Sequence, residues 1–160
     1  TLNINSNEKD LYFFNDKYFA SLRKVEGTFP EYQNLFPKET LFTAEIDKKE
    51  ILESLDRSTV VAEGYIPVTF IFENNENLTI TTLNKDVGVG NENLNVKILG
   101  VETGDINGFQ MSFNPNFLIQ GIEVLEGNKV YIRFSGNEKP VVVQGESENY
   151  KYLLMPVRAS

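Results

Sequence analysis

An internal repeat constrains this 160-residue chain more than any other feature of its sequence. Two stretches, near residues 42–55 and 109–122, match at a constant offset of 67 residues, and the match covers a strand, a helix cap and an apolar helix stripe together. Such a repeat predicts a fold made of two copies of one supersecondary unit. The matched pairs are Phe42 and Phe109, Ala44 and Met111, Ile46 and Phe113, Asp47 and Asn114, Ile51 and Leu118, and Leu55 and Ile122.

The first copy predicts a helix after Asp47, which is a good N-cap residue. Glu50 stands at the third helical position, and Ile46 is placed to pack on Ile51 across the cap. The apolar stripe that follows predicts a helix that ends near Ser58.

The second copy predicts a helix after Asn114, with Pro115 at its first position. Gly127 is expected to end this helix. Gly121 lies inside the pattern, where glycine costs about 1 kcal/mol relative to alanine. We therefore expect Gly121 to allow close approach of a neighbouring strand.

Alternating or β-branched runs predict strands over most of the remaining chain, and turn-rich tips between several of them favour antiparallel hairpins. The predicted fold class is α+β, in which two β-α-β-β-β units over residues 41–160 form a continuous antiparallel sheet with two helices on one face. The runs are Leu41–Ile46, Pro67–Glu73, Leu78–Leu83, Leu94–Val101, Phe109–Phe113, Val130–Ser135, Val141–Gln144 and Tyr150–Val157.

Residues 1–40 follow a different pattern. Three strands are expected in hairpin succession, over residues 2–6, 10–14 and 18–25, followed by an irregular stretch rich in proline and aromatic residues from Thr28 to Glu39. Three strands without a leading strand and helix match the back half of the repeated unit. We therefore expect residues 1–40 to be the tail of an upstream domain and a connector, with residues 41–160 as a whole domain.

Composition excludes most catalytic chemistry. The chain has no cysteine, histidine or tryptophan, which rules out a thiolate nucleophile, an imidazole base, a disulfide and a Cys/His zinc site. Gly88-Val89-Gly90 lacks the third glycine and the helix of a phosphate-binding loop, and Gly104–Gly108 lacks the downstream glutamate of a calcium loop. The sequence thus favours binding over catalysis and predicts neither cofactor nor metal.

The net charge of -8 opposes non-specific association with nucleic acid, and no apolar run approaches the roughly 20 residues of a membrane span. Several segments, taken in order, nevertheless resemble one family, the bacterial DNA polymerase III beta subunit or replicative sliding clamp. These segments span essentially the whole chain: Glu26–Tyr32, Ile46–Arg57, Ser112–Leu118, Lys139–Val143 and Tyr152–Arg158.

The resemblance implies the clamp fold and the end of the middle domain followed by the C-terminal domain. Proteins of this family form a homodimeric ring that encircles duplex DNA, with helices lining the hole. For this chain the resemblance therefore implies a non-catalytic processivity factor in the bacterial cytoplasm. The positions implied to face DNA are Lys48, Lys49 and Arg57, and those implied at the ring interface are Val60, Val61 and Glu92.

The family also holds the polymerase alpha subunit, the clamp loader and other clamp-motif proteins through short apolar peptides. These peptides dock in a groove between the middle and C-terminal domains. The matching groove positions here are Pro30, Leu35, Asn114, Phe117, Leu153, Met155, Pro156, Val157 and Arg158.

Two simpler interpretations stay open from the residues alone. The helix charges fit an ordinary solvated face, and the final strand fits ordinary core packing. At the level of the whole chain, the alternatives are a stand-alone β-rich ligand-binding or adhesion module and, more distantly, a carboxylate-based hydrolase.

Overall fold

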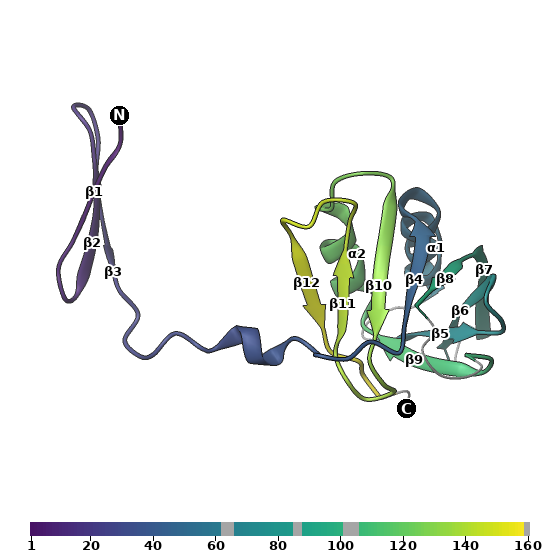
Figure 1. Ribbon diagram of the computed structural model, residues 1–160. Coiled ribbons are helices and arrows are strands. Elements are labelled where there is room, and N and C mark those ends of the chain that lie inside the picture. Colours follow the sequence, from purple (N-terminus) through teal and green to yellow (C-terminus); the bar gives the residue numbers. More distant parts are fainter. Residues whose placement is uncertain (62–65, 85–87, 101–105, 159–160) are drawn as a thin grey trace. The chain divides into compact units, whose positions relative to one another are not determined.

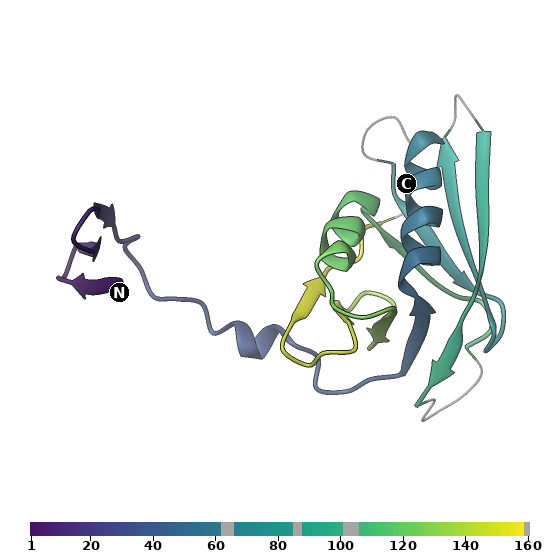
Figure 2. The same ribbon diagram turned by 90° about the horizontal axis from the view of Figure 1, so that it is seen from above.

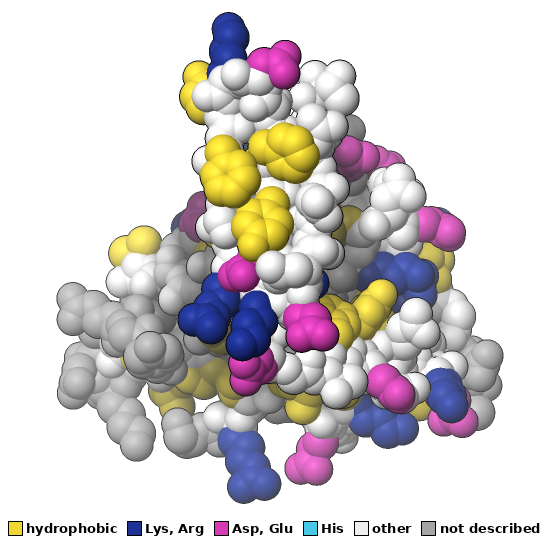
Figure 3. Space-filling model, turned by 90° about the vertical axis from the view of Figure 1, so that its left-hand side faces the viewer, with side chains coloured by type: hydrophobic (Ala, Val, Ile, Leu, Met, Phe, Trp, Pro, Cys, Tyr) yellow, Lys and Arg dark blue, Asp and Glu magenta, His cyan; other side chains and the backbone are white. Residues whose placement is uncertain are grey.

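The computed structural model describes residues 1–61, 66–84, 88–100 and 106–158. For Val61 it describes the backbone and not the side chain. The chain forms two compact units, residues 1–32 and 33–160. The first is an antiparallel sheet of β1 (Asn3–Ser6), β2 (Asp10–Phe14) and β3 (Phe19–Arg23) (Figure 1). None of its residues is fully buried, and hydrophobic side chains gather on its surface (Figure 3). This sheet has no core of its own.

The second unit contains both copies of the repeat. The first copy comprises β4 (Phe42–Asp47), α1 (Lys48–Val61), β5 (Val68–Phe72), β6 (Asn77–Asn84) and β7 (Gly88–Asn95). The second comprises β9 (Phe109–Phe113), α2 (Pro115–Glu123), β10 (Lys129–Phe134), β11 (Val141–Gln144) and β12 (Lys151–Leu154). A short 3-10 helix, η1 (Tyr32–Leu35), precedes them, and β8 (Lys97–Leu99) lies between them.

The two copies exchange their first strands. In the described residues, one sheet has the order β12-β11-β10-β4-β8 and the other has the order β7-β6-β5-β9. Thus β4 pairs antiparallel with β10 of the second copy, while β9 pairs antiparallel with β5 of the first. The α+β class and the two β-α-β-β-β units are confirmed, but the expected continuous sheet is wrong, because the strands divide into two sheets.

The helices begin where the sequence predicts. Asp47 accepts hydrogen bonds from the backbone N–H groups of Lys49 and Glu50 at 3.0 and 3.2 Å. Asn114 caps α2 by accepting from Asn116 N at 3.0 Å. Figure 2 shows the two helices side by side. Each cap satisfies backbone donors that have no partner within the helix.

The predicted helix ends are less accurate. Helix α1 continues past Ser58 to Val61, whereas α2 stops at Glu123, well before Gly127. The last turn of α2 tightens, because Leu125 N donates to Ile122 O at 3.1 Å. The helix therefore ends on a tight turn, without needing the glycine that the sequence offers four residues later.

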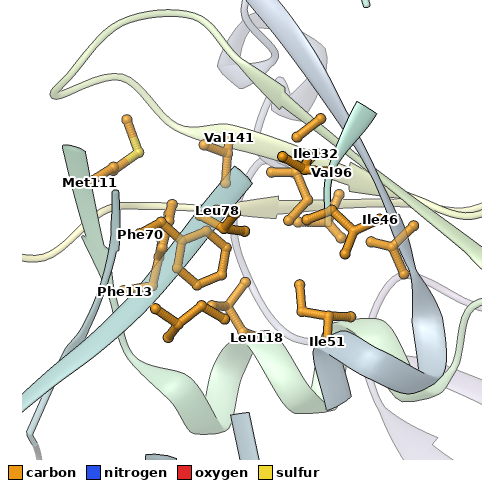
Figure 4. Close-up of a cluster of buried hydrophobic side chains, with 14 of the residues drawn as sticks. Ile46, Ile51, Phe70, Leu78, Val96, Met111, Phe113, Leu118, Ile132 and Val141 are labelled. Atoms are coloured by element: carbon orange, nitrogen blue, oxygen red, sulfur yellow. The ribbon is translucent and has the colours of Figure 1, made fainter. Parts of the chain in front are cut away.

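Alternating side chains from both sheets and one stripe from each helix form a single core (Figure 4). Phe42 and Phe134 come from the five-stranded sheet, and Phe72 and Phe109 come from the four-stranded sheet. The ring of Phe42 stacks on that of Phe134 in the same sheet, with ring centroids 4.8 Å apart. It meets the rings of Phe72 and Phe109 from the other sheet edge-to-face, with both pairs of centroids 5.1 Å apart. Edge-to-face contacts of this kind stabilise aromatic clusters beyond simple burial.

Gly121 has the role expected of it. A Cβ atom at this position would overlap the ring of Tyr152, lying 2.6 Å from its Cε1, so the glycine lets the β12 ring pack directly on α2. This contact fixes β12 against the helix, and β12 leads into the C-terminal segment that carries much of the candidate site.

Candidate functional site

The C-terminal segment crosses from one sheet to the other. β12 ends at Leu154, and the chain then passes to the outer edge of β9, where Val157 forms an antiparallel bridge with Ser112. Val157 N donates to Ser112 O at 2.8 Å. Backbone hydrogen bonds therefore hold both ends of the segment, which fixes the path of its backbone between the two sheets.

A cleft of about 540 Å³ lies along this segment. Met155 and Val157 are 58% and 40% exposed, which leaves apolar surface accessible in an otherwise ordered segment. The volume lies within the range of ordinary ligand sites. The residues around it are Thr69, Gln110, Met111, Ser112, Asn137, Glu138, Met155, Pro156, Val157 and Arg158.

The chemistry of this cleft suits an apolar group. Met111 is buried at 3% exposure, and Met155 offers an adaptable thioether side chain. The hydroxyls of Thr69 and Ser112 lie 2.8 Å apart and satisfy each other. Four predicted groove residues, from Met155 to Arg158, therefore meet at one cleft, together with β5 and β9 residues that the sequence did not single out.

A second cleft of about 340 Å³ contains Leu35. Its other residues are Asn34, Phe36, Pro37, Lys38, Glu39, Lys139 and Pro140. The loop between β10 and β11 borders both clefts, since Asn137 and Glu138 line the first while Lys139 and Pro140 line the second. Lys139 and Pro140 belong to a segment that carries the family resemblance, but the sequence did not assign the loop to a site, and its place between the clefts comes from the structure.

The remaining groove positions are more scattered. Asn114 caps α2, and Phe117 on the same helix is 49% exposed. Leu153 lies half-buried on β12, and Pro30 is exposed within the first unit. None of these residues lines the cleft beside Met155 or the one beside Leu35. Their participation in a groove stays a prediction.

Lys48, expected to face DNA, is engaged with protein. Its Nζ donates to the backbone oxygens of Glu123 and Leu125 at 3.0 and 2.5 Å. A cation at these carbonyls stabilises the negative end of α2 and satisfies acceptors that the helix leaves free. No local pattern could have revealed this contact, because the partners are more than 70 residues away.

Arg57 is also engaged. Its Nε and Nη2 donate to one oxygen of Glu92 on β7 at 2.9 and 2.7 Å, and Nη2 donates to Ser54 Oγ at 3.1 Å. The hydrogen bond to Glu92 raises the pKa of Arg57 further above its ordinary value. One residue expected at the DNA and one expected at the ring interface thus form a single ion pair.

Lys49 differs from both. Its side chain is 83% exposed, and its Nζ lies 3.8 Å from Glu53 one turn along the helix. Exposed pairs of this kind are weak and easily exchanged. Of the three candidate DNA-facing cations, Lys49 is the one most available to an anion from outside.

The candidate ring interface includes an exposed apolar surface. Val60 is 82% exposed at the end of α1, while the side chain of Val61 lies outside the described residues. Leu83 and Val89 face each other across β6 and β7 and are 57% and 63% exposed. Sequence reasoning placed Leu83 at the end of a predicted strand without assigning it to the interface. The alternating runs covered only the last residues of β7, because glycine and asparagine are poor strand formers.

Two general properties follow from the part of the chain that the structure describes. Among these residues there is no group of three or more acidic, cysteine or histidine side chains that could hold a metal ion. No helix there is long and apolar enough to cross a membrane.

Solved structures share this fold. The beta subunit of DNA polymerase III from Thermotoga maritima superposes with a TM-score of 0.86 over 99% of this chain and 42% of its own, at 22% identity. A Caulobacter crescentus polymerase III beta structure gives 0.86 over 98% of this chain and 41% of its own, at 23% identity. The expected clamp fold is confirmed.

Relatives found by sequence belong to the same family as these solved structures. The beta sliding clamp of Streptomyces coelicolor is 31% identical over 88% of this chain and 38% of its own length. The chain therefore spans about two-fifths of this relative. The model of the family described as "DNA polymerase III beta subunit, C-terminal domain" matches residues 33–158. The chain therefore belongs to the DNA polymerase III beta subunit family and carries that family's C-terminal domain.

Proposed function

We propose that this chain is the C-terminal part of a sliding clamp, a non-catalytic protein that encircles duplex DNA and tethers a polymerase to it. The observation that carries the proposal is the family match over residues 33–158. The strand-exchanged pair of sheets backed by two helices supports it. The first unit, which has no core, would then be completed by residues of the full-length protein.

Encirclement fits the charges. An acidic protein cannot rely on phosphate contacts for affinity, because each bound phosphate needs a nearby cation. Lys48 and Arg57 are occupied by intramolecular partners, while Lys49 stays available. A ring that stays on DNA through topology needs few such contacts, and weak contacts allow it to slide.

The encirclement proposal is tested with the full-length protein and its clamp loader. After loading on nicked circular DNA, we expect the protein to stay bound through gel filtration at high salt. Cutting the circle with a restriction enzyme should release it, because a ring slides off a free end. Equal retention on circular and linear DNA would contradict the proposal.

Partner recruitment would use the cleft beside Met155. An apolar residue of a partner peptide would enter between Met155 and Val157, with Phe117 as a further exposed apolar contact. Fluorescence anisotropy with a labelled Gln-Leu-Ser-Leu-Phe peptide should show saturable binding to the full-length protein. Met155→Ala and Phe117→Ala should each weaken it, whereas Gln120→Ala, an exposed change on α2, should not. Absence of saturable binding would contradict the groove.

Ring closure would use the edge of the four-stranded sheet. β7 is one of the two edge strands of this sheet in the described residues, and Val60, Leu83 and Val89 offer apolar surface close to β7 or on it. Val89→Glu in the full-length protein should shift the dimer towards monomer in sedimentation velocity, because it places a charge on a surface that would become buried. An unchanged dimer would remove this strand from the interface.

A further inference from the structure

The two methionines of the chain line the same cleft but differ in exposure. Met155 is 58% exposed and lies between the end of β12 and the bridge that Val157 makes with Ser112. Met111 is 3% exposed and lies on β9, where the strand register places it opposite Phe70 of β5. Figure 4 shows Met111 among the side chains of the core. One cleft therefore has one accessible methionine and one that the fold covers.

The composition of the chain makes these thioethers its most readily oxidised groups. Methionine is the only sulfur-bearing residue in the sequence, because cysteine is absent, and tryptophan and histidine are absent as well. Hydrogen peroxide oxidises a thioether to a sulfoxide. In this step the peroxide O–O bond breaks, an S–O bond forms, and the second peroxide oxygen leaves as water while sulfur gives up two electrons. Because the oxidant has to reach the sulfur, we expect Met155 to react before Met111.

Oxidation would change the chemistry of the cleft. The thioether of Met155 presents an adaptable apolar surface, whereas a sulfoxide is polar and accepts hydrogen bonds strongly. An apolar side chain that docked against the oxidised residue would remove water from the new oxygen and would bring no donor to replace it. A buried acceptor without a donor costs free energy. The oxidised cleft should therefore bind apolar side chains less tightly.

The fold itself should tolerate a sulfoxide at Met155. The residue lies beyond the last pair of β11 and β12, in which Leu154 is opposite Val141. The next contact along the chain is the backbone hydrogen bond from Val157 to Ser112, which does not involve the Met155 side chain. A sulfoxide at Met111 would instead put a polar group into the core. Oxidation at Met155 can thus alter binding while the core stays intact.

We propose that Met155 is a site of reversible oxidation that regulates partner binding. The thioether form of the cleft accepts an apolar side chain of a partner, and the sulfoxide form binds it weakly. Methionine sulfoxide reductases, one for each sulfoxide epimer, restore the thioether. The effect on binding rests on the proposed peptide groove, whereas the selective oxidation of Met155 over Met111 does not.

Peptide mapping by mass spectrometry tests the selectivity. The full-length protein is treated with hydrogen peroxide, and the gain of an oxygen atom is followed at both methionines. Met155 should react about tenfold faster than Met111 or more, and unfolding in urea should remove the difference. Excess Gln-Leu-Ser-Leu-Phe peptide should slow the oxidation of Met155, because a filled groove covers its sulfur. Equal rates in the folded protein would overturn the proposal.

Fluorescence anisotropy with the labelled peptide tests the consequence for binding. The oxidised full-length protein should bind about tenfold more weakly or worse, and treatment with both reductases should restore the affinity. Met155→Leu, compared with itself before and after peroxide, should show no change in affinity. Met111→Leu should lose affinity on oxidation as the wild type does. Met155→Gln, which carries a polar oxygen without any oxidant, should bind weakly from the start.

The outcomes separate this proposal from the groove on which it depends. Absence of saturable binding by the untreated protein would contradict the groove and the regulation together. Unchanged affinity after complete oxidation of Met155 would overturn the regulation and leave the groove. An equal loss of affinity in oxidised Met155→Leu would place the sensitive residue elsewhere in the full-length protein. A lowered thermal midpoint of oxidised Met111→Leu would attribute the weaker binding to loss of fold, which would also overturn the proposal.

Discussion

The guanidinium of Arg57 on α1 makes two hydrogen bonds to a single carboxylate oxygen of Glu92 on β7, at 2.9 and 2.7 Å. This pair joins the end of a helix to the outer strand of a sheet. β7 has no strand beyond it in the described residues, so the pair adds a contact from α1 to the hydrogen bonds that β7 makes with β6.

We expect Arg57→Ala and Glu92→Gln to lower the thermal midpoint of the full-length protein slightly, and the double variant to lower it by less than the sum. The coupling energy between the two residues should be smaller at about 1 M salt than at about 0.05 M, because dissolved ions screen the attraction between exposed charges. A double-mutant cycle by differential scanning calorimetry measures it. Fully additive effects at low salt would show that the pair does not form in solution.

Two adjacent lysines should behave differently. Lys48→Met removes the donor from the carbonyls of Glu123 and Leu125 and should destabilise the protein by about 1 kcal/mol. Lys49→Met should change stability little, since its side chain is exposed, but should reduce the salt dependence of DNA association. Urea unfolding and DNA binding at several salt concentrations separate the two. Equal stability losses would contradict this assignment.

Gly121→Ala should destabilise the protein, although alanine is favoured by about 1 kcal/mol in a helix. The new Cβ would lie 2.6 Å from Cε1 of Tyr152, and overpacking of this kind costs about 1–3 kcal/mol. Gln120→Ala, the neighbouring exposed position, controls for helix propensity. Combining Gly121→Ala with Tyr152→Ala should cost less than the sum of the single changes. A stabilised Gly121→Ala variant would show that the ring can move away from the helix at little cost.

Tyr152 should make stability depend on alkaline pH. Burial, with a smaller effect from Tyr150, raises the pKa of Tyr152. The folded state therefore favours the neutral phenol, so this contribution is complete below the unfolded pKa of about 10 and is lost as pH rises through the folded value. Between about pH 8 and about pH 11, the unfolding midpoint of Tyr152→Phe should fall by less than that of the wild type. An identical fall would contradict the shift.

Local signals in the sequence predicted the elements well. Alternation located most strands, and Asp47 and Asn114 marked both helix starts, because caps and alternation depend on neighbouring residues. The two-sheet arrangement was not predicted, since pairing of β4 with β10 depends on contacts between distant segments. β7 was only partly predicted, because its glycines and asparagines form a strand through pairing with β6 rather than through propensity.

The candidate site was predicted in part for the same reason. Met155 to Arg158 lie together because they are consecutive, and the structure places them along one cleft. The partners of Lys48 and Arg57 come from other elements of the fold. From the helix sequence alone both cations appeared free to bind DNA, whereas in the structure both make contacts within the protein. Which exposed cations are free can be decided only after the chain has folded.

The exchanged first strands also bear on how such a domain could arise. A single repeat alone would leave its leading strand without a sheet, since β4 pairs with β10 and β8, and β9 pairs with β5. Two separate copies of one repeat could satisfy each other by trading that strand, as in a domain-swapped homodimer. The present chain has the architecture expected if the gene of such a homodimer had been duplicated and fused. The strand pairing that once joined two molecules would then lie within a single chain.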